Sequence, residues 1–406
     1  MAQPSLTKRS SFSILTQPPV GMPRSSGPAS ASAIPSSASV SGSGLLASAM
    51  SNSSSGGSRQ TTASATPRRG AYFESHWPLY AVDWSTSAFQ RGPGRIAVAT
   101  CTEDSNNRIQ ILQPTPVAET QANGQQIPSL ELNKTAESAV VYPCTRVRWD
   151  PFAGRAMGGN IERLATAGDF LRIWEYNPET MTLRQSSLLA NKTKSDYTAP
   201  LTSLDWNATD NSLVITSSID TTCTIWDLNT STAKTQLIAH DKEVFDARFT
   251  TGSADVFASV GADGSVRVFD LRSLEHSTII YEPVNPPPLL RISTNSRDPN
   301  MLATFSIDSN VVHVLDIRSP GTPVIELDAH MGNINAVEWA PKQRNAIATC
   351  SDDCQVLVWD VSSNRPDIAF AYTENAEVNN LTWSANGEWI GAIAGRGLQA
   401  VRMGYK

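Results

Sequence analysis

The sequence of 406 residues has few of the residue types that build metal sites and disulfides, with five His and five Cys. The Cys residues are odd in number and show no framework spacing, which indicates a reducing compartment. Cys350 and Cys354 have no second Cys or His pair nearby, so we expect no zinc site. The sequence also lacks a Gly-x-x-x-x-Gly-Lys phosphate loop, and no apolar run approaches the roughly 18–20 residues that span a bilayer. We therefore expect no cofactor, no metal and no membrane insertion.

Residues 1–70 lack Asp and Glu altogether. They contain six basic residues, 20 Ser and one aromatic residue, Phe12. Such a composition buries too little apolar surface to offset chain entropy, so residues 1–69 are predicted to be a disordered tail. Phosphorylation of Ser10, Ser11 or Ser13, beside Lys8 and Arg9, would turn a basic patch acidic. A transit peptide is the alternative for this segment.

The rest of the chain has the opposite charge. Subtracting the tail leaves 26 basic residues (32 − 6) and all 38 acidic residues, a net charge of −12. An acidic body does not favour direct binding to nucleic acid phosphates. Residues 70–406 are predicted to form the folded domain.

An internal repeat runs through this domain. The clearest units contain a small-residue strand, a turn with an Asp, and a strand ending in an aromatic residue or Leu before an acid, as in TCTIWDL, SVRVFDL, VVHVLDI and QVLVWDV, and FLRIWEY is the same element with Glu for Asp. A second landmark lies upstream in each unit, at Trp84, Trp149, Trp206, Phe249, Ile292, Trp339 and Trp383. Apolar and polar residues alternate around all of these positions, which is typical of half-buried strands. The fold predicted is all-β, a seven-bladed WD-repeat β-propeller.

The spacing also predicts how the ring is interrupted and closed. The first two intervals between landmarks are long, so we expect a Pro- and Gln-rich loop near 113–129 and extra residues near 151–161 and 175–199. Only three strands of the last blade fit before the chain ends at Lys406. Residues 70–76 are expected to supply its fourth strand and remove an exposed edge.

Two groups of polar residues recur at fixed offsets in two blades. In blade 6 they are His330, Thr349, Asp353 and Trp359, and in blade 4 they are His240, Ser259, Asp263 and Phe269. We interpret them as buried structural hydrogen-bond chains, because a catalytic triad has no reason to occur twice. Phe cannot donate a hydrogen bond, so the blade 4 chain is expected to end one bond early.

No plausible catalytic centre is found, and the surface of the propeller remains as the functional part. Exposed aromatic residues are candidate partner-binding positions, and Phe170, Tyr176 and Tyr281 are the ones considered. An enzyme would require a cluster of acids and bases in the central channel, which the sequence gives no reason to expect.

Several segments go beyond a generic propeller. AHDKEVFDARF, FASVGADGSVRVFDLRSLEHSTIIYEP, SSIDTTCTIW and LATAGDFLRIWEY closely resemble one WD-repeat family. It comprises the plant TRANSPARENT TESTA GLABRA-type regulators and animal relatives that scaffold DYRK-type kinases and are counted among cullin-RING ligase associated factors. The resemblance covers about 72–402 and is most specific over 199–283.

The resemblance implies a non-enzymatic adaptor found in nucleus and cytoplasm. Its implied partners are DYRK-type kinases and MYB or basic helix-loop-helix transcription factors. The alternative is a substrate receptor of a cullin-RING E3 ubiquitin ligase. Ligase associated factors carry an Asp-x-Arg box thought to face the ligase adaptor, and two such boxes occur here, Asp270 with Arg272 and Asp316 with Arg318. The second box departs from the family pattern, because Leu315 stands where the motif has Trp.

Overall fold

Seven four-stranded antiparallel sheets make up the domain. The computed structural model describes residues 71–86, 93–120, 124–152, 161–190 and 198–404, and every regular element in these ranges is a strand. The predicted tail lies outside the described residues. Within the described part of the chain, no helix is long and apolar enough to cross a membrane.

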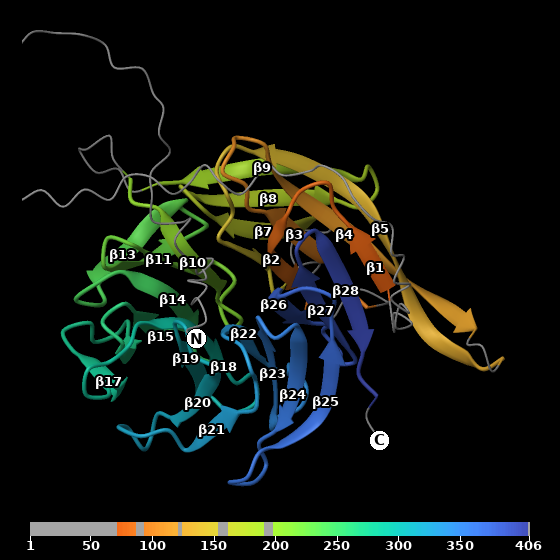
Figure 1. Cartoon of the computed structure of the whole chain (residues 1–406). Coiled ribbons are helices and arrows are strands. Elements are labelled where there is room, and N and C mark those ends of the chain that lie inside the picture. The colour runs from red at the N-terminus through yellow and green to blue at the C-terminus, as the bar shows by residue number, and fades with distance from the viewer. Residues whose placement is uncertain (1–70, 87–92, 121–123, 153–160, 191–197, 405–406) are drawn as a thin grey trace, which may run out of the picture. The chain divides into compact units, whose positions relative to one another are not determined.

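The strands follow the chain blade by blade (Figure 1). Blade 1 contains β2 (Leu79–Trp84), β3 (Ile96–Thr100), β4 (Asn107–Thr120) and β5 (Gln126–Val140). Blade 2 contains β6 (Arg146–Trp149), β7 (Glu162–Ala167), β8 (Leu171–Asn177) and β9 (Thr182–Leu189). Blade 3 contains β10 (Leu201–Trp206), β11 (Leu213–Ser218), β12 (Thr222–Asp227) and β13 (Thr232–Ile238). Blade 4 contains β14 (Val244–Phe249), β15 (Val256–Gly261), β16 (Val266–Asp270) and β17 (Ser277–Tyr281).

The other three blades continue this order. Blade 5 contains β18 (Leu289–Thr294), β19 (Met301–Ser306), β20 (Val311–Asp316) and β21 (Ile325–Asp328). Blade 6 contains β22 (Ile334–Trp339), β23 (Ala346–Ser351), β24 (Gln355–Asp360) and β25 (Asp367–Thr373). Blade 7 contains β26 (Val378–Trp383), β27 (Trp389–Ala394), β28 (Gly397–Arg402) and, from the other end of the domain, β1 (Ala71–Glu74).

The first strands of the blades close a ring. Each packs against the first strand of the next blade, from β2 through β6, β10, β14, β18 and β22 to β26, which returns to β2. Figure 1 shows these strands around the centre. The predicted seven-bladed propeller is confirmed. The hydrophobic core lies between neighbouring blades, as where Phe305 and Leu327 of blade 5 pack with Trp339 and Trp359 of blade 6.

The predicted closing strand is also confirmed. β1 pairs antiparallel with β28, with Ala71 opposite Ala400 and Glu74 opposite Gly397. Its other side is covered by blade 1, because Ala71 and Phe73 pack in one cluster with Leu130 and Leu132 of β5. β1 therefore links the first and last blades covalently and by packing.

Two details of the sequence interpretation are wrong. In the other blades the aromatic landmark is the last residue of the first strand. In blade 5 the last residue of that strand is Thr294, which pairs with Leu302 in the same way as Phe249 of blade 4 pairs with Phe257. Ile292 lies two residues earlier, because the blade 5 strand has no aromatic residue to mark its end.

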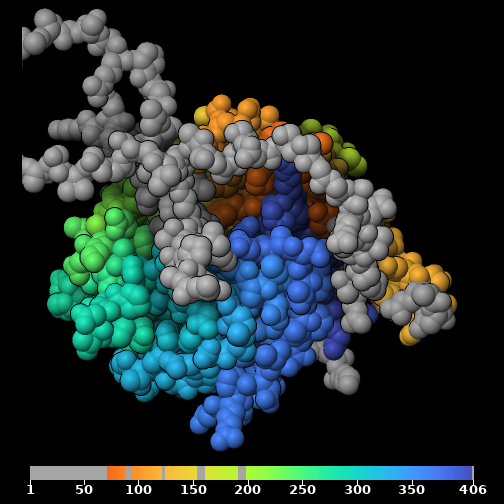
Figure 2. All heavy atoms as spheres, in the orientation of Figure 1, coloured from red at the N-terminus to blue at the C-terminus, as the bar shows by residue number. Residues whose placement is uncertain are grey.

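The expected loop near 113–129 is largely a β-ribbon. β4 and β5 stay paired from Asn107 opposite Val140 to Thr120 opposite Gln126, and the ribbon projects at the right of Figures 1 and 2. The prolines of this segment suggested a loop. Each proline lacks one backbone N–H donor, and an edge strand tolerates that loss where the position faces solvent. The extra residues expected in blade 2 fall partly outside the described residues.

The Asp turns between second and third strands have a common geometry. Asp220, Asp263 and Asp353 each accept a hydrogen bond from the backbone N–H two residues on, at 3.0–3.2 Å. The residue after each Asp has positive φ, 73° at Thr221, 75° at Gly264 and 66° at Cys354. The carboxylate thus replaces a backbone acceptor and fixes the tight turn.

The hydrogen-bond chain of blade 6 contains all four residues proposed for it. Trp359 Nε1 donates to Thr349 Oγ1 at 2.9 Å, and Thr349 Oγ1 lies 2.8 Å from His330 Nε2. Asp353 accepts from the Nδ1–H of His330 at 2.9 Å, which leaves Nε2 of the neutral imidazole as an acceptor, so the Thr349 hydroxyl donates to it. Burial lowers the pKa of His330, which agrees with a neutral imidazole.

The chain in blade 4 is one member shorter. His240 lies 2.8 Å from Ser259 Oγ and 2.9 Å from Asp263 Oδ1. Phe269 stands where blade 6 has Trp359 and stacks on Phe257 at 5.0 Å between ring centroids. Ser259 therefore links fewer groups than Thr349 does.

We expect Thr349→Val to lower the free energy of unfolding by about 3 kcal/mol, because the indole N–H and the imidazole nitrogen both lose a buried partner. Ser259→Ala should cost about half as much, since a single imidazole partner is lost there. Urea unfolding of the two variants measures the difference. An equal or smaller loss in Thr349→Val would contradict the assignment.

Candidate functional site

The propeller has two faces with different loops. First and third strands run in the same direction, because each is antiparallel to the second strand between them. In blade 4, for example, β15 pairs antiparallel with both β14 and β16. The loops that follow first and third strands therefore lie together on what we name the box face. The loops that follow second and fourth strands form the opposite face.

Both Asp-x-Arg boxes lie on the box face, in neighbouring blades. Asp270 ends β16, and Asp316 ends β20. Arg272 Nε lies 2.8 Å from Asp270 Oδ1, and Arg318 Nε lies 2.9 Å from Asp316 Oδ1. In each box the second guanidinium nitrogen reaches the other carboxylate oxygen, so both pairs are bidentate.

The box arginines are held in place while staying exposed. Their side chains are 69% exposed for Arg272 and 64% for Arg318. The bonds from Arg272 lower the pKa of Asp270 to about 2, so this carboxylate is ionised throughout the physiological range. Blades 3 and 6 lack this arginine. The residue two positions after the acid is Asn229 in blade 3, after Asp227, and Ser362 in blade 6, after Asp360. Blades 4 and 5 thus present a pair of oriented guanidinium groups.

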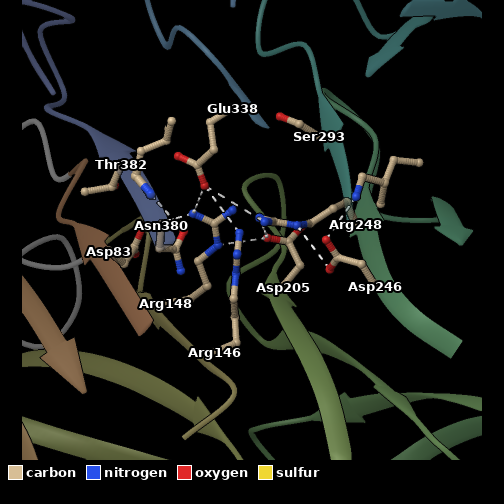
Figure 3. A network of polar contacts seen from close by, with 12 residues as sticks. Asp83, Arg146, Arg148, Asp205, Asp246, Arg248, Ser293, Glu338, Asn380 and Thr382 are labelled. Carbon is tan, nitrogen blue, oxygen red and sulfur yellow. Dashed lines mark hydrogen bonds and ion pairs between the residues drawn. The ribbon is translucent and has the colours of Figure 1, made fainter. Parts of the chain in front are cut away.

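A polar ring lines the central channel, which opens on the box face. It consists of the residue before the last in each first strand: Asp83, Arg148, Asp205, Arg248, Ser293, Glu338 and Thr382. The cavity has a volume of about 370 Å³. Figure 3 shows side chains of this ring converging from several blades.

Four members of this polar ring connect neighbouring blades through backbone N–H groups. Asp83 accepts from Trp149 at 2.7 Å, and Asp205 accepts from Phe249 at 3.0 Å. Ser293 accepts from Trp339, and Thr382 accepts from Trp84, both at 3.1 Å. The bond from Trp84 to Thr382 connects blade 7 to blade 1 and so closes the ring.

Glu338 lies close to three arginines of the channel. One of its oxygens lies 3.3 Å from Arg146, 3.8 Å from Arg148 and 4.0 Å from Arg248 (Figure 3). Arg148 also pairs with Asp83 at 2.9 Å, and Arg248 with Asp205 at 3.5 Å. In the described part of the chain no other carboxylate lies within 4.0 Å of Arg146, so this buried guanidinium depends on Glu338.

Burial shifts the acids of the channel strongly. It raises the pKa of Asp83 to about 6 and that of Asp205 to about 7, against the opposing effect of Arg148. Such shifts are typical of catalytic acids and also of structural ion-pair networks. Here the carboxylates accept from backbone N–H groups and arginines of neighbouring blades, which indicates a role in holding the blades together.

This cluster of charged residues was not predicted from the sequence. The sequence does contain a pattern that marks these residues. In five blades an acid or an arginine stands directly before the landmark residue, in VDW, VRW, LDW, ARF and VEW. These residues meet only when the ring closes, since Arg146 and Glu338 are 192 positions apart.

The three aromatic residues considered as partner-binding positions differ in their exposure to solvent. Tyr176 and Tyr281 are buried, so both are wrong as exposed contact residues, because strand alternation turns them into the core between blades. Phe170 is partly exposed on the opposite face, with the guanidinium of Arg172 5.6 Å from its ring centroid.

Comparisons with known proteins support the fold and narrow the family. The model of the WD domain, G-beta repeat, matches residues 191–227 and 321–360. A DDB1- and CUL4-associated factor 7 homolog from Dictyostelium discoideum is 44% identical over 342 residues, covering 82% of this chain and 98% of that protein. An uncharacterized WD repeat-containing protein of Schizosaccharomyces pombe is 36% identical and covers 82% of this chain and 89% of its own length.

A WD repeat-containing protein of Saccharomyces cerevisiae is 39% identical over 344 residues, and the match spans 61% of that longer protein. These relatives support the ligase-associated part of the resemblance, while the likeness to TRANSPARENT TESTA GLABRA-type regulators stays an expectation. A propeller with such relatives is an adaptor scaffold for protein partners. The chain therefore belongs to the WD40-repeat family, in the group that includes the DDB1- and CUL4-associated factor 7 homolog.

Proposed function

We propose that this chain is a non-enzymatic adaptor that bridges regulatory proteins and that its box face docks the DDB1 subunit of a CUL4 ubiquitin ligase. The pair of exposed, oriented arginines in blades 4 and 5 carries the ligase part of the proposal. The name of the Dictyostelium relative supports the choice of DDB1 and CUL4.

The geometry suits recognition of acceptors on a partner. A guanidinium has five N–H donors, and each box Asp engages two of them. The other donors are free to meet carboxylates or backbone carbonyls across an interface. The ion pair within each box also limits the rotamers of the arginine, which reduces the entropy lost on binding.

The regulatory partners implied by the family resemblance are DYRK-type kinases and MYB or basic helix-loop-helix transcription factors. A rigid ring with two separate faces supports simultaneous binding of such a protein and a ligase subunit. The proposed location is nucleus and cytoplasm. If the bound regulatory proteins are ubiquitinated, the chain acts as the substrate receptor, which is the second candidate function.

The two functions separate in one capture experiment. Arg272→Ala combined with Arg318→Ala should remove DDB1 from material purified with the tagged full chain while kinases or transcription factors stay bound. Mass spectrometry of the captured proteins gives both results. Arg184→Ala is the matched control, because Arg184 is 73% exposed and also pairs with an acid, Glu175, but lies in blade 2. Undiminished DDB1 in the double variant would contradict the box assignment.

A further inference from the structure

The opposite face carries an acidic sector over blades 3 to 5. We define it by six loops, 219–221, 239–243, 262–265, 282–288, 307–310 and 329–333. They contain six acidic residues and one basic residue, Lys242, and two of the acids, Asp241 and Asp263, pair with Arg267 of β16. Asp220, Glu243, Glu282 and Asp308 are exposed. This sector therefore presents a negative surface to solvent.

The same sector exposes large apolar side chains. Ile238, at the end of β13, is 75% exposed, and Val284 and Met331 are 93% and 88% exposed. Each lies in or next to a loop that joins one blade to the next. Exposed aliphatic side chains stand among the acidic residues here. A surface that is acidic only for contact with water would not need them, so this surface is suited to binding a partner.

A hollow adjoins the acidic sector between blades 2 and 3. Its volume is about 70 Å³, and Phe170, Leu171, Leu201 and Trp226 are among the residues that line it. Asp169 and Asp220 also line it. Asp169 is paired with Arg172, so Asp220 is the acid that a basic residue next to one inserted apolar side chain would meet.

We infer that the acidic sector docks a segment of this same chain, Leu6–Leu15. This segment, LTKRSSFSIL, combines two basic residues with Leu6, Phe12, Ile14 and Leu15 and contains no acid. Lys8 and Arg9 complement the acidic loops, and the apolar residues complement Ile238, Val284, Met331 and the hollow. The inference does not depend on the proposed binding of DDB1.

The length of chain outside the described domain allows this contact. Fifty-five residues, 16–70, separate Leu15 from the start of β1 at Ala71. A flexible chain of that length spans about 40 Å on average, whereas a domain of this size has a radius of gyration of about 20 Å. The tether makes docking intramolecular, with an effective concentration on the order of millimolar.

The box face is the less suitable surface for this segment. In blades 5 and 6 it exposes the cations Arg297, Lys342 and Arg365, together with Arg318 and Arg344, which are paired with Asp316 and Asp298. Like charges there would repel Lys8 and Arg9. The charge distribution therefore directs the segment to the opposite face.

A labelled synthetic peptide of residues 1–18 tests the inference by fluorescence anisotropy with the full chain. In wild type the chain's own segment occupies the surface, so the added peptide should bind weakly. Lys8→Glu with Arg9→Glu in the full chain removes the competitor, and the peptide should bind at least tenfold more tightly. Adding Glu243→Lys and Glu282→Lys to that variant should abolish the binding.

The control reverses two exposed acids on the box face, Glu275→Lys and Glu388→Lys, in the same background and should leave the tight binding unchanged. All these side chains are exposed, and unchanged melting temperatures verify folding. No binding in any variant, or binding indifferent to Glu243→Lys and Glu282→Lys, would overturn the inference. Equal affinity for wild type and the Lys8→Glu, Arg9→Glu chain would also overturn it, because the surface would then take a basic segment from another protein.

Discussion

Deleting residues 1–77 should lower the melting temperature by about 8 °C, whereas deleting residues 1–65 should leave it unchanged. The longer deletion removes β1, which pairs four residues with β28 and covers Leu130, Leu132 and Leu398. Four backbone pairs at about 1 kcal/mol each give a loss of about 4 kcal/mol, and each kcal/mol is worth about 2 °C in a domain of this size.

Differential scanning calorimetry of the two truncated chains measures this effect. The shorter deletion is the control, since it removes most of the basic tail and keeps β1. Equal melting temperatures for the two truncations would contradict the role of β1 as the closing strand. The longer deletion should also promote association, because β28 would then be an open edge.

Glu338→Gln should lower the free energy of unfolding by about 3 kcal/mol. The substitution keeps the shape of the side chain but leaves Arg146, which is 5% exposed, without a carboxylate partner. Removing one partner of a buried ion pair typically costs 3–5 kcal/mol, mainly because the other charge stays buried. Urea unfolding of the full chain provides the measurement.

A double substitution is the matched control for this prediction. Arg146→Met combined with Glu338→Met replaces the buried pair by apolar groups and should restore most of the lost stability. Arg148 and Arg248 keep Asp83 and Asp205 as partners in that variant. Additive losses in the double variant would show that Arg146 and Glu338 do not depend on each other.

Much of the fold follows from local patterns. Strand alternation marks the blades, and the Asp turn and the acid at the end of the third strand recur in most of them, so seven blades and the closing strand could be predicted from the sequence. Blade 5 was misplaced by two residues because Thr294 carries no aromatic signal. The ribbon of β4 and β5 was missed because Pro114 and Pro116 suggest a loop, although edge strands accept proline.

The channel could not be predicted in the same way. Its charges belong to blades far apart in sequence, and their pairing exists only in the closed ring. The boxes were found because they are local, with Asp and Arg two positions apart. Their geometry, an exposed and bidentate pair, required the structure.

Isothermal titration calorimetry of purified DDB1 with the purified full chain measures whether the two boxes dock the ligase subunit. We expect Arg272→Ala with Arg318→Ala to raise Kd at least tenfold, which corresponds to about 1.4 kcal/mol, and Arg184→Ala to leave Kd unchanged. Equal Kd values for wild type and the double variant would contradict docking through the two boxes.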